Sequence, residues 1–186
     1  MNTLRRFLKQ IFAACFVAVL SGLPVQAQSD RLDSLFDELK QPDLPNWKMV
    51  ENQIWTEWSK SGSPAMDLLL QRGREAMQAG DYDMAIGHFT ALIDHAPDFA
   101  EGYNARATAF FRKGLFGPAL ADIRRTLALN PRHFGAMMGL GAILEELQHE
   151  EQALAAYRAA HALHPHEPDL GQAIERLEKA VSGVTL

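Results

Sequence analysis

Apolar residues recur along most of this chain at helical spacing, and one set of positions returns every 34 residues. Four classes of position share that period without a gap. They are a proline, an alanine, a small residue and a bulky residue: Pro97, Pro131 and Pro165; Ala85, Ala119 and Ala153; Gly73, Ala107 and Gly141; Phe89, Ile123 and Tyr157. Four independent coincidences at one period indicate an internal repeat rather than chance.

Each repeat carries the signals of two short helices joined by a turn. In the first, Gly73 and Ala85 are small enough for two helices to cross closely. Gly80 supplies the backbone freedom that a tight turn needs, and Pro97 ends the second helix because it lacks an amide proton. Pro118 falls in the first turn of a helix, where a missing N–H costs little.

These segments resemble tetratricopeptide repeats from about Met66 to Glu167. The resemblance implies an all-α, right-handed α-solenoid of three antiparallel helix pairs, with further helices at both ends. It also implies a protein that binds other proteins or peptides on a concave surface. It gives no indication of catalysis, so we expect no enzyme, no catalytic residue and no cofactor.

One more amphipathic helix is expected at about residues 168–181. Its apolar stripe consists of Leu170, Ala173, Ile174, Leu177 and Val181. A stacked array exposes an apolar face at its end, so we interpret this helix as a cap.

Two helices are predicted before the repeats, at residues 30–41 and from a cap at Asn46 to about residue 60. The second contains all three tryptophans of the protein, Trp47, Trp55 and Trp58. The favoured interpretation is a degenerate repeat whose tryptophans cover the first true unit. The alternative is that the tryptophans meet a partner or plug the groove.

The first 27 residues have the pattern of a secretory signal peptide. Arg5, Arg6 and Lys9 precede an apolar run from residue 11 to 20, and Ala27 ends a small-residue cleavage motif. The run is shorter than the ~20 residues of a spanning helix, so cleavage after Ala27 is preferred to an uncleaved anchor. The expected divisions are therefore 1–27 (signal), 28–62 (N-terminal helices) and 63–186 (array and cap). We expect export to a bacterial periplasm and membrane contact only during export.

Removing this segment makes the remaining chain more acidic. It holds three basic and no acidic residues, which leaves 15 Lys and Arg against 23 acidic residues. That balance speaks against nucleic acid or an anionic membrane as a partner. The single cysteine, Cys15, lies in the signal, so the mature protein must hold together by packing.

Histidines offer the only candidate metal ligands. His161, His164 and His166 lie close together near the end of the third repeat. No cysteine or well-spaced carboxylate accompanies them in the sequence, so we expect no metal site.

Family geometry assigns nine residues to a peptide-binding groove. They are Leu70, Arg74, Met77, Asn104, Thr108, Phe111, Arg112, Met138 and Glu145. Asp67, Glu101, Ala142 and Glu146 belong to the same face. The apolar strip among them suits an extended or helical peptide, although the N-terminal helices of the chain are a possible cover.

One branch of the family grips the carboxylate of chaperone tails with Lys, Asn and Arg. The matching positions here hold Leu70, Arg74, Ala105, Gly135 and Gly139, so that clamp is absent. The predicted function is an exported scaffold that binds a protein or peptide partner. The alternative is a homo-oligomeric module that self-associates through the tryptophan-rich helix.

Overall fold

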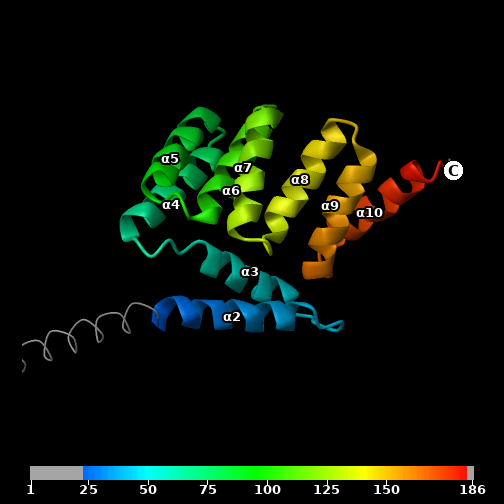
Figure 1. Cartoon of the computed structure of the whole chain (residues 1–186), viewed down its shortest axis with the longest axis horizontal. Coiled ribbons are helices and arrows are strands. Elements are labelled where there is room, and N and C mark those ends of the chain that lie inside the picture. Colours follow the sequence, from blue (N-terminus) through cyan, green and yellow to red (C-terminus); the bar gives the residue numbers. More distant parts are fainter. Residues whose placement is uncertain (1–22, 184–186) are drawn as a thin grey trace, which may run out of the picture.

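The computed structural model describes residues 23–183, and their side chains from Asp30 onward. This part of the chain is helical and contains no strand (Figure 1), which confirms the all-α solenoid. Its helices are α2 (Leu23–Leu39), α3 (Trp47–Trp58), α4 (Pro64–Gln78), α5 (Tyr82–His95), α6 (Ala100–Arg112), α7 (Phe116–Leu129), α8 (Phe134–Glu146), α9 (Glu150–Leu163) and α10 (Pro168–Val181).

The predicted signal peptide lies largely outside the described residues. Helix α2 begins at Leu23, earlier than the expected start at residue 30 and ahead of the proposed cleavage point. Within residues 23–183, no helix is both long and apolar enough to span a membrane.

Helices α4 to α9 form three antiparallel pairs, as the period predicts. The turns within the pairs place Gly80, Gly114 and Gln148 at φ values of 76°, 72° and 60°. This left-handed conformation favours glycine, so the first two turns use the expected residue and the third does not. Pro118 lies near the start of α7, where the helix tolerates it.

The small residues of the repeats face bulky ones on the paired helix. A Cβ added at Gly141 would lie 2.5 Å from Cε1 of Tyr157, and Gly73 packs in the same way beneath Phe89. The small and bulky classes found in the sequence are therefore two halves of one contact. Any larger side chain at the glycine would force the two helices of the pair apart.

The N-terminal hairpin, α2 and α3, does not extend the array as a degenerate repeat. It runs beneath the array, with α3 between α2 and the repeats (Figure 1). Phe36, Val50, Ile54 and Trp58 share one core with Phe134 of the third repeat. The expectation that the tryptophans cover the first repeat is therefore wrong. The sequence indicates that the apolar faces of the two hairpin helices are buried, but it does not indicate which helices they contact.

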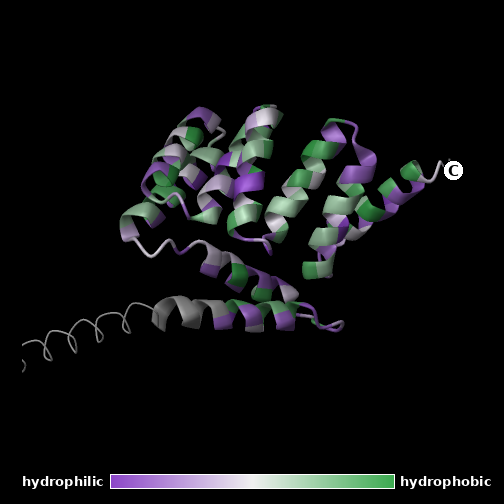
Figure 2. Ribbon diagram, viewed as in Figure 1, coloured by the Kyte–Doolittle hydropathy of each residue, from purple (hydrophilic) through white to green (hydrophobic). Residues whose placement is uncertain are grey.

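The composition of α8 accounts for this arrangement. The helix reads FGAMMGLGAILEE and has no polar residue before its last turn, and its apolar character is visible in Figure 2. A helix that is apolar on all sides must be covered on all sides. Helices α9 and α7 cover part of α8, and Trp55 and Trp58 of the hairpin pack against its first residues, Phe134 and Gly135.

Helix α10 packs on α9 as the predicted cap. Leu170 and Leu177 are buried, and Ala173 and Ile174 pack partly against the same core. Val181 departs from the prediction, because it remains 40% exposed at the end of the helix.

Candidate binding surface

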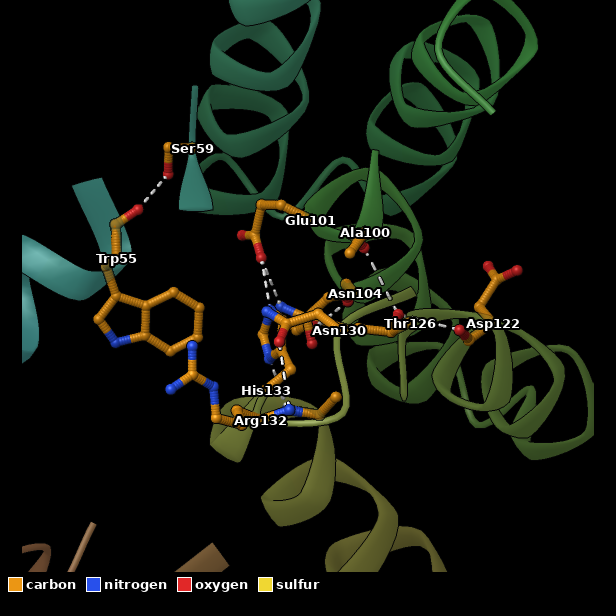
Figure 3. Close-up of polar contacts among 12 residues, drawn as sticks. Trp55, Ser59, Ala100, Glu101, Asn104, Asp122, Thr126, Asn130, Arg132 and His133 are labelled. Carbon is orange, nitrogen blue, oxygen red and sulfur yellow. Dashed lines mark hydrogen bonds and ion pairs between the residues drawn. The ribbon is translucent and has the colours of Figure 1, made fainter. Parts of the chain in front are cut away.

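A buried carboxylate connects the first helices of all three repeats. Glu101, at the start of α6, is 3% exposed. One of its oxygens lies 2.6 Å from Nη2 of Arg74 on α4, and the other lies 3.0 Å from Nε2 of His133 before α8. Asn104 donates to the latter oxygen at 3.1 Å (Figure 3). These partners compensate the cost of burying the charge.

The hydrogen bonds of His133 determine its tautomer. Its Nδ1 accepts from the backbone N–H of Ala136 at 3.1 Å and so caps α8. The proton of the neutral ring must then sit on Nε2 and point at Glu101. His133 thus fixes the carboxylate and the start of α8 together.

Helix α3 covers this network from outside. The Trp58 ring stacks on His133 at 4.2 Å between centroids with an interplanar angle of 18°. Cη2 of Trp55 occupies the space in which a Cβ at Gly135 would stand, 2.5 Å away. Ser59 Oγ accepts from both terminal nitrogens of Arg74 at 3.0 Å. Trp55, Trp58 and Ser59 of the chain itself therefore occupy the part of the concave surface around Arg74, His133 and Gly135.

An open cleft of about 750 Å³ remains between α3 and α4. Its lining residues are Asn52, Trp55, Thr56, Ser59, Lys60 and Arg74. Arg74 and Lys60 are each paired with a buried carboxylate, Glu101 and Glu57 respectively. The cleft thus offers a half-buried indole beside cations whose charge is largely balanced.

The predicted groove residues fall into distinct environments in the first two repeats. Leu70 does not line the groove, because it is 2% exposed and packs in the core of the first repeat. Arg74 and Asn104 both contact Glu101. Met77 is half-buried against the first core, and Thr108 is exposed.

The remaining four predicted residues are largely engaged within the fold. Phe111 packs on Phe116 of α7, and Arg112 lies over the Tyr82 ring of α5. Met138 packs partly against the core between the hairpin and the third repeat. Glu145 accepts from Tyr157 at 2.8 Å and pairs with Arg176 of α10 at 2.6 Å. The continuous apolar strip expected from Leu70 to Met138 is therefore not present as an open surface.

Comparison with known proteins agrees with this fold. A family model described as tetratricopeptide repeat matches residues 70–121 and 106–168. The chain belongs to the tetratricopeptide repeat family. A TPR repeat-containing protein of Rhizobium etli is 32% identical over 154 residues, which cover 82% of this chain and 76% of that protein. This match is longer than the stretch from Trp47 to the end of the chain, so it includes α3.

Other similar proteins match the repeats alone, either within a much longer chain or as an isolated repeat domain. The Hsp70-Hsp90 organizing protein of Triticum aestivum is 32% identical over 60% of this chain, which corresponds to 19% of its own length. The first TPR of Spaghetti (RPAP3), solved with the HSP90 peptide SRMEEVD, is 27% identical with a TM-score of 0.61. That similarity covers 63% of this chain and 93% of the solved one.

Within this tetratricopeptide array, ion pairs brace neighbouring helices. Hydrogen bonding to Arg176 holds the pKa of Glu145 below its usual range, and the Tyr157 hydroxyl adds to the effect. In the second repeat, Arg106 of α6 forms a bidentate ion pair with Asp122 of α7, in which Nε and Nη2 donate to the two carboxylate oxygens at 2.7 and 2.8 Å. The hydrogen bonding of Arg106 to the Asp122 carboxylate raises the pKa of Arg106. Both pairs hold their helices together and leave little free charge for a ligand.

The histidine-rich end of the third repeat differs from its sequence-based interpretation. The fold brings Glu51 of α3 and Glu167 to His164, with one potential ligand atom of each within 4.8 Å of the others. Glu167 follows His164 by three residues, and Glu51 comes from the N-terminal hairpin. Glu51 lies far from His164 in sequence, so no local spacing could reveal the pair.

Proposed function

We propose that this protein is an exported scaffold that binds a peptide of another envelope protein in the cleft between α3 and α4. The observation that carries the proposal is the open cleft of about 750 Å³ beside Trp55 and Arg74. A relative in the same family was solved with a peptide bound, and the concave side of such arrays is the usual binding surface.

The chemistry of the cleft favours a peptide with an apolar or aromatic side chain. Trp55 is half-buried and offers part of its indole to the cleft. Arg74 and Lys60 already neutralise Glu101 and Glu57, so an acidic tail would gain little from them. The partner expected here therefore differs from the HSP90 peptide of the RPAP3 domain.

The positions of the missing chaperone clamp support this distinction. Leu70 is buried, and Gly135 lies beneath Trp55. A cationic side chain at either position would collide with the core or with α3. The proposed cleft thus uses the residues of α3 where the chaperone-binding branch uses cations of the array.

Blocking the cleft tests the proposal. Thr56 is exposed and hydrogen-bonds only within its own helix, to the carbonyl of Asn52 at 2.7 Å. The change Thr56→Arg adds bulk to the cleft without removing a tertiary contact. Ala121→Arg, on the exposed side of α7, adds the same side chain elsewhere and serves as the control.

Partners are captured from an envelope extract with the parent protein, and the affinity of the recovered partner is measured for both variants. We expect at least a tenfold loss for Thr56→Arg and none for Ala121→Arg. Equal affinity of Thr56→Arg and the parent would place the binding surface elsewhere on the array.

Export is tested separately by the N-terminus of the secreted protein. Expression of the full chain in a Gram-negative host, followed by mass spectrometry of the periplasmic fraction, should give Gln28 as the first residue. Recovery of uncleaved protein in the cytoplasm would contradict export while leaving the cleft proposal intact.

The three indoles do not support self-association in the way the sequence suggests. Trp58 is buried on His133, and Trp47 packs against His164. Trp55 contacts Trp58, His133 and Phe134. The tryptophans are engaged within one chain, so the feature that motivated a homo-oligomer has an intramolecular explanation.

A further inference from the structure

His164 is a buried histidine whose ring has no hydrogen-bond partner among the described residues. Its side chain has no exposed surface, and both Nδ1 and Nε2 lack a partner. Leaving a buried polar atom unsatisfied costs about 1–3 kcal/mol, and such atoms are rare in native proteins. The ring therefore requires an explanation beyond packing.

Two carboxylates from separate elements converge on this ring. Oε1 of Glu51, on α3, lies 3.6 Å from Nε2 of His164. Glu167, between α9 and α10, contributes an oxygen within 4.8 Å of both other atoms. The 3.6 Å separation is too long for a good hydrogen bond. It is close to the ~3.3 Å expected between two ligands of a tetrahedral ion with bonds of about 2.0 Å.

The surroundings hold two of these groups, His164 and Glu51, in position. The rings of Trp47 and Phe134 make T-shaped contacts with the His164 ring, at centroid distances of 5.3 and 4.9 Å. Nε1 of Trp55 donates to Oε1 of Glu51 at 3.2 Å and orients that carboxylate. Metal ligands in proteins are typically fixed by such outer contacts.

The charge state of the imidazole suits a ligand role. Burial lowers the pKa of His164, in spite of opposing contributions from Glu51 and Glu167. A neutral imidazole has a lone pair available for a metal ion, whereas a protonated one does not. His166 is committed elsewhere, since its Nε2 lies 2.8 Å from the carbonyl oxygen of Gln41.

We propose that Glu51, His164 and Glu167 form a binding site for Zn²⁺. One imidazole nitrogen and two carboxylate oxygens suit this ion, and solvent completes a four-coordinate shell. Mg²⁺ and Ca²⁺ fit less well, because they prefer six or more oxygen ligands. The ion would join α3 to the end of the third repeat and so stabilise the hairpin across the array.

The test is zinc binding by the purified protein and by variants that keep side-chain shape. Equilibrium dialysis and calorimetry with zinc chloride should show one ion per chain. Glu51→Gln and Glu167→Gln should each weaken binding at least tenfold. Glu150→Gln, an exposed residue on α9, and His149→Ala should leave the affinity unchanged.

A second readout identifies the ligands and does not depend on stability. Co²⁺ in the site should give the visible absorption bands of a four-coordinate ion with nitrogen and oxygen ligands, and Glu51→Gln should abolish them. Absence of zinc binding at 100-fold molar excess would overturn the proposal. So would equal affinities of the parent, Glu51→Gln and Glu167→Gln, because the ion would then sit on surface histidines.

Discussion

The first two repeats and the third repeat use the same helix pair in different surroundings. The core of the first repeat is built from residues between Met66 and Ala109, and that of the second from residues between Ala107 and Ile143. The core of the third contains residues from Leu32 to Trp58 as well as residues from Phe134 to Leu177. Two repeats thus pack with near neighbours, whereas the third needs a segment about a hundred residues earlier.

This difference changes how the array holds together. A simple solenoid is stabilised by contacts between adjacent units only. Here the N-terminal hairpin spans the array and fastens its far end, at the entropic cost of closing a long loop. The core between the hairpin and the third repeat offsets that cost with an aromatic cluster of Phe36, Trp55, Trp58 and Phe134.

The largest effect that separates the two regions is expected from Phe134→Ala. Phe134 is buried within the aromatic cluster, and its loss should destabilise the protein by about 3–5 kcal/mol. Trp55 and Trp58 lie at 5.5 and 5.0 Å from its ring, so their emission should shift to longer wavelength. Denaturant titration followed by fluorescence measures both effects.

Phe89→Ala is the matched control for that change. Phe89 is equally buried, but it lies in the first repeat, whose core contains no tryptophan. We expect a similar loss of stability and little change in the emission of the folded state. Equal spectral shifts in both variants would show that the two cores are coupled and would contradict the division drawn here.

A smaller and more local effect is expected at the contact between α3 and α8. Gly135→Ala places a methyl group where Cη2 of Trp55 stands and should cost about 1–3 kcal/mol as α3 shifts. Gly139→Ala, one turn later on the same helix, meets only Ile123 at 3.5 Å. It should be neutral or stabilising by about 0.5–1 kcal/mol through helix propensity.

Near-ultraviolet circular dichroism distinguishes the two alanines. The signal of the packed tryptophans should fall in Gly135→Ala and stay unchanged in Gly139→Ala. If the two variants behaved alike, Trp55 would not be held against α8 in solution.

The sequence predicts the local features of this molecule well and the long-range ones poorly. The 34-residue period, the glycine turns and the cap helix all follow from residues near one another. The place of α3 does not, since an apolar stripe on a helix shows only that the stripe is buried. The composition of α8 was the available signal, because a helix without a polar face needs a cover on each side.

The binding surface shows the same division. Arg74 and Asn104, which family register assigns to the groove, both contact Glu101, and their part in binding stays a prediction. Trp55, Thr56 and Lys60 were missed as cleft residues, since they come from outside the array. His133 was missed because its part in the network depends on Glu101, which lies in the preceding repeat.

The smallest effect concerns the turn of the third repeat. Gln148 has a φ of 60°, where the first two repeats have glycine. A side chain in this conformation costs roughly 1–2 kcal/mol of folding free energy. Glycine removes that cost, but its greater freedom in the unfolded chain offsets part of the gain in stability. Gln148→Gly should therefore stabilise the protein by up to about 1 kcal/mol, measured by thermal unfolding. Gly114→Gln, the reverse change in the second repeat, should destabilise it by a similar amount. A gain of stability in Gln148→Gly together with a loss in Gly114→Gln would show that the third turn tolerates glutamine at a local cost. A loss of stability in both variants would mean instead that the Gln148 side chain contributes contacts of its own.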